Sequence, residues 1–358
     1  MPRSAARIDW HMPLMQLITR YGLHLRWLAL AVVATVPLSA CTVAAAAASI
    51  SPEGREPPVK SLQIRLLSTM LAGDPLFKGI GEWGFSALVD VDGRRFLFDT
   101  GLRSETVLRN AKELGLDLSD VEDVIFSHHH GDHAGGLLTL RRACSAKNPS
   151  ALSRVHVSSG IFWSRGRADN VAQDGNPMIS IRAAFEATGG RFVEHAGLVE
   201  LAPGVWFTGP VPRRHPERNW SGDGRVKNEE GRWIEDNVPE DASLVFDTVR
   251  GLVVLSGCGH AGIVNTLEYA RAVVRAVPVV AAVGGFHLFN AAEESLAWTS
   301  SKLRECGVRH FLAAHCTGIE ATYRVRELAG LDRRTCVVAA VGSGFDLGGG
   351  IEPLLLAK

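Results

Sequence analysis

The sequence predicts an α/β protein in which β-sheets are covered by helices. Short apolar segments alternate with helix-like segments between about residues 62 and 341. This alternation is typical of sheets packed against helices. The two halves of this stretch also share one layout, a strand-rich start followed by alternating strands and helices. We therefore expect the strands to pair at the centre of the fold, with the helices outside.

The composition narrows the function classes. The 358-residue chain has 38 basic and 38 acidic residues, so its formal net charge is zero. A neutral chain has no overall field that gathers nucleic acid, so we expect a small-molecule substrate and no nucleic-acid partner. Apolar residues at 46% and charged residues at 21% are typical of a packed globular chain. Six cysteines are too few for a disulfide scaffold.

The first 40 residues predict an export signal of the lipoprotein type. A basic head with a single acid, Asp9, precedes a short apolar run over 27–36, which is the pattern of a secretory signal. Leu38-Ser39-Ala40-Cys41 then resembles a lipobox, in which the cysteine is lipidated and becomes the new N-terminus. We therefore expect an exported protein, periplasmic or anchored in the membrane through Cys41.

Two other interpretations of this segment stay open. An ordinary cleavage site within 44–48 would give a secreted protein. An uncleaved anchor is the other, because no charge occurs between residues 27 and 52, and a membrane helix needs about 20 residues. Pro37 counts against the anchor. Residues 41–60, rich in Ala, Pro and Ser, predict a flexible tether, and residues 61–358 predict the folded domain.

The elements of the domain follow from local patterns, taken in chain order. Asp92-Gly93 is a two-residue hairpin signal between two apolar runs. A helix that ends on Gly115 has a typical terminator.

The periodicity weakens over about 158–241, which we expect to be an insert that shapes a substrate pocket. Its four tryptophans either line that pocket or fill a small core. The predicted strands are 62–70, 85–91, 94–99, 121–127, 154–157, two runs within 244–256, 277–283, 310–314 and 336–341, and the predicted helices are 105–115, 135–145, 261–274, 291–306 and 321–328.

A cluster of metal-ligand residues follows the apolar strand 121–127. It reads Ser127-His128-His129-His130-Gly131-Asp132-His133-Ala134-Gly135-Gly136. Imidazole and carboxylate are ligands that borderline divalent metals accept. His128 and His130 are two apart on an extended loop and can share one metal, while Asp132 and His133 can face a second. A chance histidine run is the alternative, but four ligand-type side chains at a strand-to-helix turn count against it.

Three more histidines occupy equivalent places. His260, His287 and His315 each follow an apolar strand and precede a helix. The carboxyl ends of strands in alternating α/β units share one edge, where ligands bind. We therefore expect His260 and His315 to be metal ligands that converge with the first cluster. His287 is either a ligand or a substrate contact.

These motifs resemble the metallo-β-lactamase fold hydrolases. The hallmark of that superfamily, His-x-His-x-Asp-His followed by Gly-Gly, stands at 128–136. The resemblance implies an αββα sandwich with the metals at one edge of its two sheets. Phe98-Asp99-Thr100-Gly101 is similar to the superfamily's first motif, whose aspartate orients the metal loop. His315 stands where the last metal histidine is expected.

A narrower resemblance points to the branch named for dihydropterin–ribofuranosylaminobenzene-phosphate synthase. It rests on the segments 256–266, 284–288, 315–318 and 207–213. The branch name implies a pterin-linked transferase. The sequence departs from the better-known superfamily pattern at the bridging aspartate, where Cys258 or His287 stands instead. A bridge by thiolate or imidazole would differ from a carboxylate bridge. Cys258 can also be a nucleophile or a buried small residue.

The combined expectation is a metal-dependent hydrolase. A bound metal lowers the pKa of its water to about 7, and the resulting hydroxide would attack an ester, a phosphodiester or a lactone. Asp132 would orient that nucleophile, and Asp99 would fix the ligand loop. One or two divalent metals are expected, zinc first, with iron or manganese open. His128, His130 and His260 would hold the first metal, and Asp132, His133 and His315 the second.

Two rivals stay open. A transferase of the pterin-synthase type would use the same metals to hold a phosphorylated or pterin substrate. A metal-binding or sensor module would have a closed metal site without an open coordination position. Export counts against the transferase, because pterin synthesis depends on cytoplasmic substrates.

Overall fold

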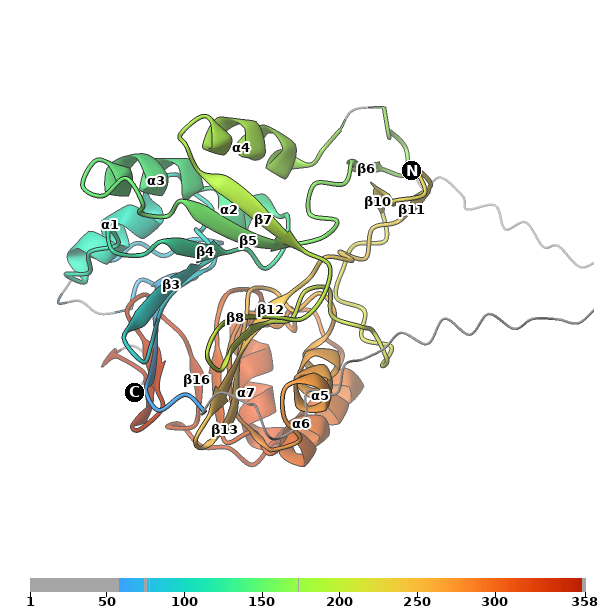
Figure 1. Ribbon diagram of the computed structural model, residues 1–358. Helices are drawn as coiled ribbons and strands as arrows, with labels where there is room; N and C mark the ends of the chain where they lie inside the picture. Colours follow the sequence, from blue (N-terminus) through green and yellow to red (C-terminus); the bar gives the residue numbers. More distant parts are fainter. Residues whose placement is uncertain (1–57, 74–75, 77, 173, 356–358) are drawn as a thin grey trace, which may run out of the picture. The chain divides into compact units, whose positions relative to one another are not determined.

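The computed structural model describes residues 58–73, 76, 78–172 and 174–355 (Figure 1). They belong to the unit Glu53–Lys358. The expected signal over 1–40, Cys41 and the tether up to residue 57 lie outside the described residues. Val59 is fully buried, and its N–H donates to the Asp247 carbonyl at 2.7 Å. The packed body therefore includes residues just ahead of Ser61.

The first sheet has eight strands and carries the expected hairpin. Asp92 and Gly93 have φ values of 47° and 81°, as a type I′ turn requires, so the predicted hairpin is confirmed. From β3 to β7 the strands run parallel. In spatial order the strands are β18 (Gly350–Glu352), β17 (Gly344–Asp346), β1 (Leu62–Ser68), β2 (Ser86–Val91), β3 (Arg94–Phe98), β4 (Asp123–Ile125), β5 (Arg154–Ser158) and β7 (Arg191–His195).

The second sheet has seven strands, of which β13 to β16 run parallel. Its centre is almost entirely apolar, because both faces of β13 and β14 are covered. In spatial order the strands are β16 (Cys336–Val338), β15 (His310–Ala313), β14 (Val279–Gly284), β13 (Gly251–Ser256), β12 (Ser243–Thr248), β9 (Val205–Phe207) and β8 (Val199–Ala202).

Three apolar clusters show a four-layer αββα sandwich. One cluster joins the facing sides of the two sheets, with Phe85, Phe98 and Phe246 among its members. A second lies between the first sheet and its helices, and a third between the second sheet and its own helices (Figure 1). The predicted fold class is confirmed. The first sheet is covered by α1 (Thr106–Glu113), α2 (Gly131–Ala134), α3 (Leu137–Ser145) and α4 (Pro177–Glu186), and the second by α5 (Ile263–Val273), α6 (Glu293–Cys306) and α7 (Ile319–Leu328).

The stretch 158–241 contributes to three different sheets. β7 completes the first sheet, and β8 and β9 extend the second. Only β6 (Arg165–Arg167), β10 (Gly224–Lys227) and β11 (Trp233–Glu235) pair apart, as a small antiparallel sheet. The weak sequence pattern of this region reflects short strands, several of which have an exposed face.

Several elements differ from the prediction. The helix expected over 135–145 begins at Leu137 as α3, and an unexpected short helix, α2, precedes it; Gly135 and Gly136 separate the two. A Cβ on Gly135 would lie 1.8 Å from the Leu102 carbonyl oxygen, so the chain breaks the helix where it packs against that backbone. The strand expected over 336–341 ends at Val338. No helix among the described residues combines the length and apolar character that crossing a bilayer requires.

Candidate metal centre

Four strand ends deliver the candidate ligands to one edge of the sandwich. The loop after β4 carries residues 128–133, and the loops after β13, β14 and β15 carry Cys258 with His260, His287 and His315. Pairing in register aligns the last three ends, since Ser256 pairs with Gly284 and Gly284 with Ala313. The expectation that these side chains converge on one edge agrees with the structure.

The first set of ligand atoms belongs to His128, His130 and His260, all within 4.8 Å of one another. His128 Nε2 and His130 Nδ1 are 2.9 Å apart. His260 donates from Nδ1 to the Asn219 carbonyl at 2.5 Å. Its Nε2 is buried and has no hydrogen-bond partner among the described residues. Nitrogen lone pairs that point at one another repel, and a cation bound between them removes this repulsion.

The second set belongs to Asp132, His133 and His315 and meets the same 4.8 Å limit. His315 Nε2 lies 3.3 Å from Asp132 Oδ2, and His133 Nε2 lies 3.9 Å from the same oxygen. Both histidines are fully buried, whereas the Asp132 side chain keeps an exposed fraction of 18%. The set therefore combines a carboxylate near solvent with two imidazoles behind it.

Asp99 holds residues of both ligand sets in place through hydrogen bonds. Its Oδ1 accepts the Ser127 N–H at 2.9 Å, and its Oδ2 accepts the Ser127 hydroxyl at 2.8 Å and His133 Nδ1 at 2.7 Å. Because the Ser127 hydroxyl proton goes to Asp99, Ser127 Oγ accepts from His128 Nδ1 at 2.9 Å. Nε2 of His128 is then left with its lone pair. Asp99 is fully buried and acts through Ser127 and His133, so it is a positioning residue.

The electrostatics of the edge favour positive charge near Asp132. Burial lowers the pKa values of His128, His130 and His260 well below the usual range, and neighbouring imidazoles lower them further. Burial also opposes charge on His133, but the carboxylates of Asp99 and Asp132 outweigh it and raise its pKa to about 9. A cation is therefore stabilised at His133, either a proton or a metal ion.

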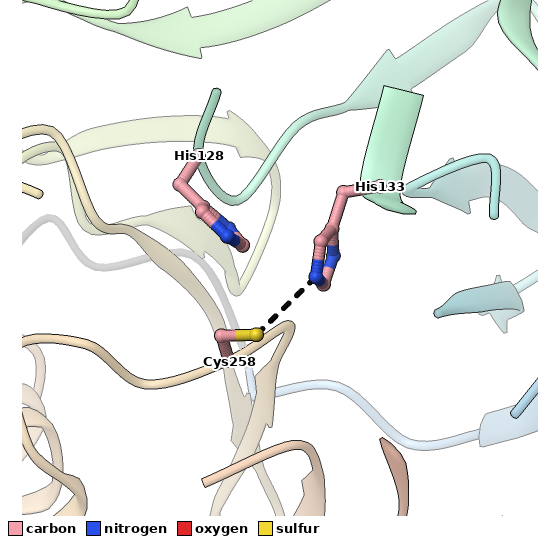
Figure 2. Close-up of side chains that lie close together, drawn as sticks. All are labelled: His128, His133 and Cys258. Carbon is pink, nitrogen blue, oxygen red and sulfur yellow. Dashed lines mark hydrogen bonds between the residues drawn. The ribbon is translucent and has the colours of Figure 1, made fainter. Parts of the chain in front are cut away.

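Cys258 lies close to His128 of the first set and His133 of the second (Figure 2). Its Sγ is 3.3 Å from His133 Nε2 and 3.3 Å from Cys316 Sγ, and it shares one group of potential ligands with His128 and His133. Burial and the adjacent Cys316 raise the pKa of the Cys258 thiol well above its usual range. His287 joins Cys258 and His260 in a further group. Cys316 follows His315 directly, and its contact with Cys258 arises only from the fold.

Three of these residues have a left-handed backbone. Asp99, His287 and His315 have φ values of 54°, 49° and 48°. Each comes directly after a strand or its connecting loop, where the chain must turn to aim a side chain along the edge. Such a conformation costs a non-glycine residue on the order of 1–3 kcal/mol, so the surrounding packing must hold it. Strain of this kind is typical of functional sites.

His129 belongs to a buried ion network rather than to a ligand set. Its Nδ1 lies 2.6 Å from Glu240 Oε1, and Glu240 Oε2 accepts from Arg165 at 2.6 Å. Arg165 also pairs with Asp236 at 3.0 Å. The network connects the metal loop with β6 of the small sheet. Burial opposes charge on Glu240, but Arg165 and His129 lower its pKa to about 2.

A pocket opens beside the first set. A cavity of about 260 Å³ is lined by His130, His260, His287 and Trp220, among others. It shares Trp220 and His287 with a larger cavity of about 670 Å³, which also has Trp298 in its wall. Of the four tryptophans between 163 and 233, Trp206 is buried between sheet and helices instead. Trp298 lies on a helix with an ordinary core pattern, so the sequence did not single it out.

A second aromatic wall lies on the side of His315. Trp83 is 45% exposed, and its ring centroid is 5.0 Å from that of His315. Phe289 meets Trp83 edge to face at 5.7 Å. Neither residue was expected from the sequence, because an isolated aromatic residue in a loop has no pattern.

The donor set fits divalent metal ions. It offers two groups of three ligands with buried lone pairs, hydrogen bonds that fix the imidazole rings, and a pocket that leaves one side open. The structure brings all nine expected site residues to one edge: Asp99, His128, His130, Asp132, His133, Cys258, His260, His287 and His315, with His287 at the pocket.

Comparisons with known proteins agree with this geometry. The profile of the metallo-beta-lactamase superfamily matches residues 84–275. A Methanocaldococcus jannaschii protein named 7,8-dihydropterin-6-methyl-4-(beta-D-ribofuranosyl)-aminobenzene-5'-phosphate synthase is 30% identical over 248 residues, which are 67% of this chain and 82% of that protein. An uncharacterized protein of the same organism is 24% identical over 254 residues, covering 70% of this chain and 90% of its own length.

A solved structure shows the same architecture. It is described as a metal-dependent hydrolase of the beta-lactamase superfamily, and it is 29% identical with a TM-score of 0.59. The match covers 74% of this chain and 92% of the solved one. The predicted resemblance, including that to the pterin-synthase branch, is confirmed. With its αββα layers and its edge of histidines, the chain belongs to the metallo-β-lactamase superfamily.

Proposed function

We propose that this protein is a metal-dependent hydrolase that cleaves a neutral ester or lactone. One observation carries the proposal: two ligand sets lie side by side at a sheet edge, and the first of them lines a pocket. A bound divalent metal supplies two things, a lower pKa for its water, about 7, and polarisation of the bond to be broken. His128, His130 and His260 would hold the first metal, and Asp132, His133 and His315 the second.

The remaining steps belong to the residues of the chain. Asp132 is the one carboxylate of the ligand sets, and it is partly open to solvent, so it can orient the attacking water and accept its proton. Asp99 keeps His133 in the tautomer whose Nε2 faces the metal position. His287 lines both cavities and contacts the substrate beside the reacting group.

The charges of the larger cavity support a neutral substrate over a phosphodiester. Its wall includes the carboxylate of Glu294 and the carboxyl of Glu217, whose pKa burial raises to about 7. Its cationic groups are engaged, since Arg218 pairs with Glu235 at 2.6 Å and His215 lies 2.9 Å from Glu268. A phosphate would find no cation without a partner among these groups, whereas a flat or apolar group can pack on Trp220 and Trp298.

A second candidate is a transferase of the pterin-synthase type. The observation that favours it is the 30% identity to the Methanocaldococcus jannaschii synthase. The aromatic wall of the larger cavity is compatible with a flat ring. The transferase would hold a phosphorylated substrate with the same metal ligands.

The deciding experiment is a turnover assay of the metal-loaded chain on three substrate classes. A p-nitrophenyl ester, a lactone and a bis-aryl phosphodiester would be compared, with elemental mass spectrometry of each sample. We expect turnover on the ester or lactone that falls to background in His130→Ala and persists in His310→Ala, a histidine outside the ligand sets. Metal-loaded protein that turns over none of them but binds a pterin would favour the transferase.

A further inference from the structure

The segment 214–220, called the strap below, forms one wall of the larger cavity without regular secondary structure. Residues 215–220 all line the cavity of about 670 Å³, and the start of α6 with the loop before it lines the other side. Within the part of the chain that the structure describes, no hydrogen bond between two backbone groups involves residues 212–221. Other contacts must therefore hold this wall in place.

The side-chain amide of Asn265, in the first turn of α5, supplies such contacts. Its Oδ1 accepts the N–H groups of Arg214 and His215, each at 2.7 Å. Its Nδ2 donates to the His215 carbonyl at 3.1 Å and to the Ala261 carbonyl at 2.8 Å. Asn265 is 2% exposed, and these four bonds use both donors and both acceptor sites of its amide. An apolar side chain here would leave two backbone N–H groups of the strap without acceptors.

The start of α5 is shaped to receive the strap. Gly262 has a φ of 99°, and a Cβ on it would lie 2.2 Å from Glu217 Oε2, so only glycine leaves room for that side chain. The Glu217 carboxyl accepts the N–H groups of Val264 and Asn265 at 3.1 and 2.8 Å. N–H groups in the first turn of a helix have no partner within the helix. The strap and the start of α5 therefore satisfy each other's free backbone groups.

The far end of the strap reaches the first set of candidate ligands. The Asn219 carbonyl accepts from His260 Nδ1 at 2.5 Å, and Asn219 Nδ2 donates to the Gly259 carbonyl at 3.1 Å. A proton held on Nδ1 of His260 leaves the lone pair on Nε2, the buried atom that has no hydrogen-bond partner among the described residues. The position of the strap therefore decides which nitrogen of His260 is free to bind a metal ion.

We propose that Asn265 is a positioning residue that sets both the cavity wall and the ring of His260. Its amide bonds the backbone of the strap, a few positions before the carbonyl that orients the ring, so it acts through the strap. The part of the inference that concerns substrate rests on the proposed function. The part that concerns His260 requires only a metal ion at the first ligand set.

The test compares Asn265→Leu with the wild type. Leucine has a similar size and removes all four hydrogen bonds of the amide. We expect zinc affinity, measured in competition with a chelating dye, to fall about 10-fold. Nitrogen-15 NMR of the metal-free chain, labelled at histidine, should show His260 as the Nδ1–H form in the wild type and as a mixture of both forms in the variant. His260→Gln identifies the signal.

Kinetics on a p-nitrophenyl ester at saturating zinc separate positioning from stability. A displaced wall weakens substrate binding, so KM should rise about 10-fold while kcat stays within about 2-fold. Loss of folded protein would instead lower kcat and leave KM unchanged.

Asn148→Ala is the matched control. The Asn148 amide also fastens a loop, since it donates to the Ser119 carbonyl and accepts the Ser150 N–H. Its partners precede β4 and β5, at the end of the first sheet away from the ligand loop. This variant should keep the zinc affinity, the His260 tautomer and the KM of the wild type.

Asn265→Asp keeps the proposal testable if the leucine variant does not fold. Aspartate retains an acceptor oxygen for the N–H groups of Arg214 and His215 but lacks both donors. Its zinc affinity and KM should therefore lie between the wild-type values and those expected for leucine. A folded leucine or aspartate variant with the zinc affinity, tautomer and KM of the wild type would overturn the role. So would a change in kcat alone.

The same samples separate this inference from the proposed function. If the wild type turns over no ester but Asn265→Leu changes zinc affinity and tautomer, the positioning of His260 is supported and the hydrolase is contradicted. Turnover by both proteins with equal KM and equal zinc affinity keeps the hydrolase and overturns the positioning role. A wild type that binds no zinc contradicts both.

Discussion

Arg165 and Glu240 are 75 positions apart in the chain, yet their side chains form a buried ion pair of 2.6 Å. Glu240 also binds His129 inside the metal loop, at 2.6 Å from Nδ1. The pair therefore joins the small sheet to the loop that carries His128 and His130. Its position indicates that folding of the small sheet and ordering of the metal loop depend on each other.

The first prediction concerns this pair. Arg165→Met or Glu240→Gln alone leaves a buried group without one of its charged partners, and each should lower the free energy of unfolding by about 3–5 kcal/mol. The double variant Arg165→Met/Glu240→Gln should cost less than the sum of the two. Urea denaturation in a double-mutant cycle measures the difference. Strictly additive single effects would contradict the coupling.

The second prediction concerns Asp99. In Asp99→Asn the amide N–H₂ would face His133 Nδ1 and force the ring proton onto Nε2, the nitrogen that faces the metal position. We expect metal affinity to fall about 10- to 100-fold with the fold intact. A competition titration against a chelating dye measures the affinity. Asp90→Asn on β2 is the control, and equal affinities in the two variants would rule out the positioning role.

The third prediction concerns pH. Burial raises the pKa of Glu217 from 4.5 to about 7, although N–H groups of Asn265 and Val264 at the start of α5 donate to its carboxylate. The native state therefore binds the proton more tightly than the unfolded chain. The contribution of Glu217 to stability is complete below pH 4.5 and is lost as the pH rises to about 7.

The contribution of Glu217 to stability has an upper limit. The difference between its two pKa values, 4.5 and about 7, corresponds to about 3 kcal/mol, and solvent screening of a half-buried group reduces that figure. Urea unfolding between pH 5 and 7.5 should show a flatter pH dependence in Glu217→Gln than in the wild type. Glu294→Gln, an exposed carboxyl in the wall of the same cavity, should keep the wild-type slope. Parallel curves for all three proteins would refute the assignment.

The fourth prediction concerns the N-terminal segment. If residue 41 carries the lipid, Cys41→Ser should move the protein from the membrane fraction of a bacterial host to the soluble fraction. Mass spectrometry of the N-terminal peptide would identify the acyl groups directly. An unmodified peptide that begins within 44–48 would instead support ordinary secretion.

Much of the site could be predicted because its ligands follow a local rule. The cluster at 128–133 is contiguous, and His260, His287 and His315 each come after an apolar strand. Parallel pairing then requires those strand ends to meet. The helices and central strands were predictable for a similar reason, since a long apolar run carries its own signal.

The residues that escaped prediction act through long-range contacts. Asn219 contributes only its carbonyl oxygen to His260, so its side chain carries no information about that role. Arg165 and Glu240 look like ordinary charges until the fold pairs them. The strands β17 and β18 have three residues each and begin with glycine, and their place beside β1 depends on the whole sheet. Cys316 became visible only once β13 and β15 placed it against Cys258.

The candidate ligands come from both halves of the sandwich, residues 128–133 from the first sheet and His260, His287 and His315 from the second. An ion held by both halves acts as a cross-link that closes one end of the interface. Binding and closure are then linked quantities: at a metal concentration 1,000 times the dissociation constant, the native state gains about 4 kcal/mol. Any change that loosens the packing between the two sheets must therefore weaken metal affinity, even far from the edge. A gain in metal affinity stabilises the interface between the sheets by the same amount.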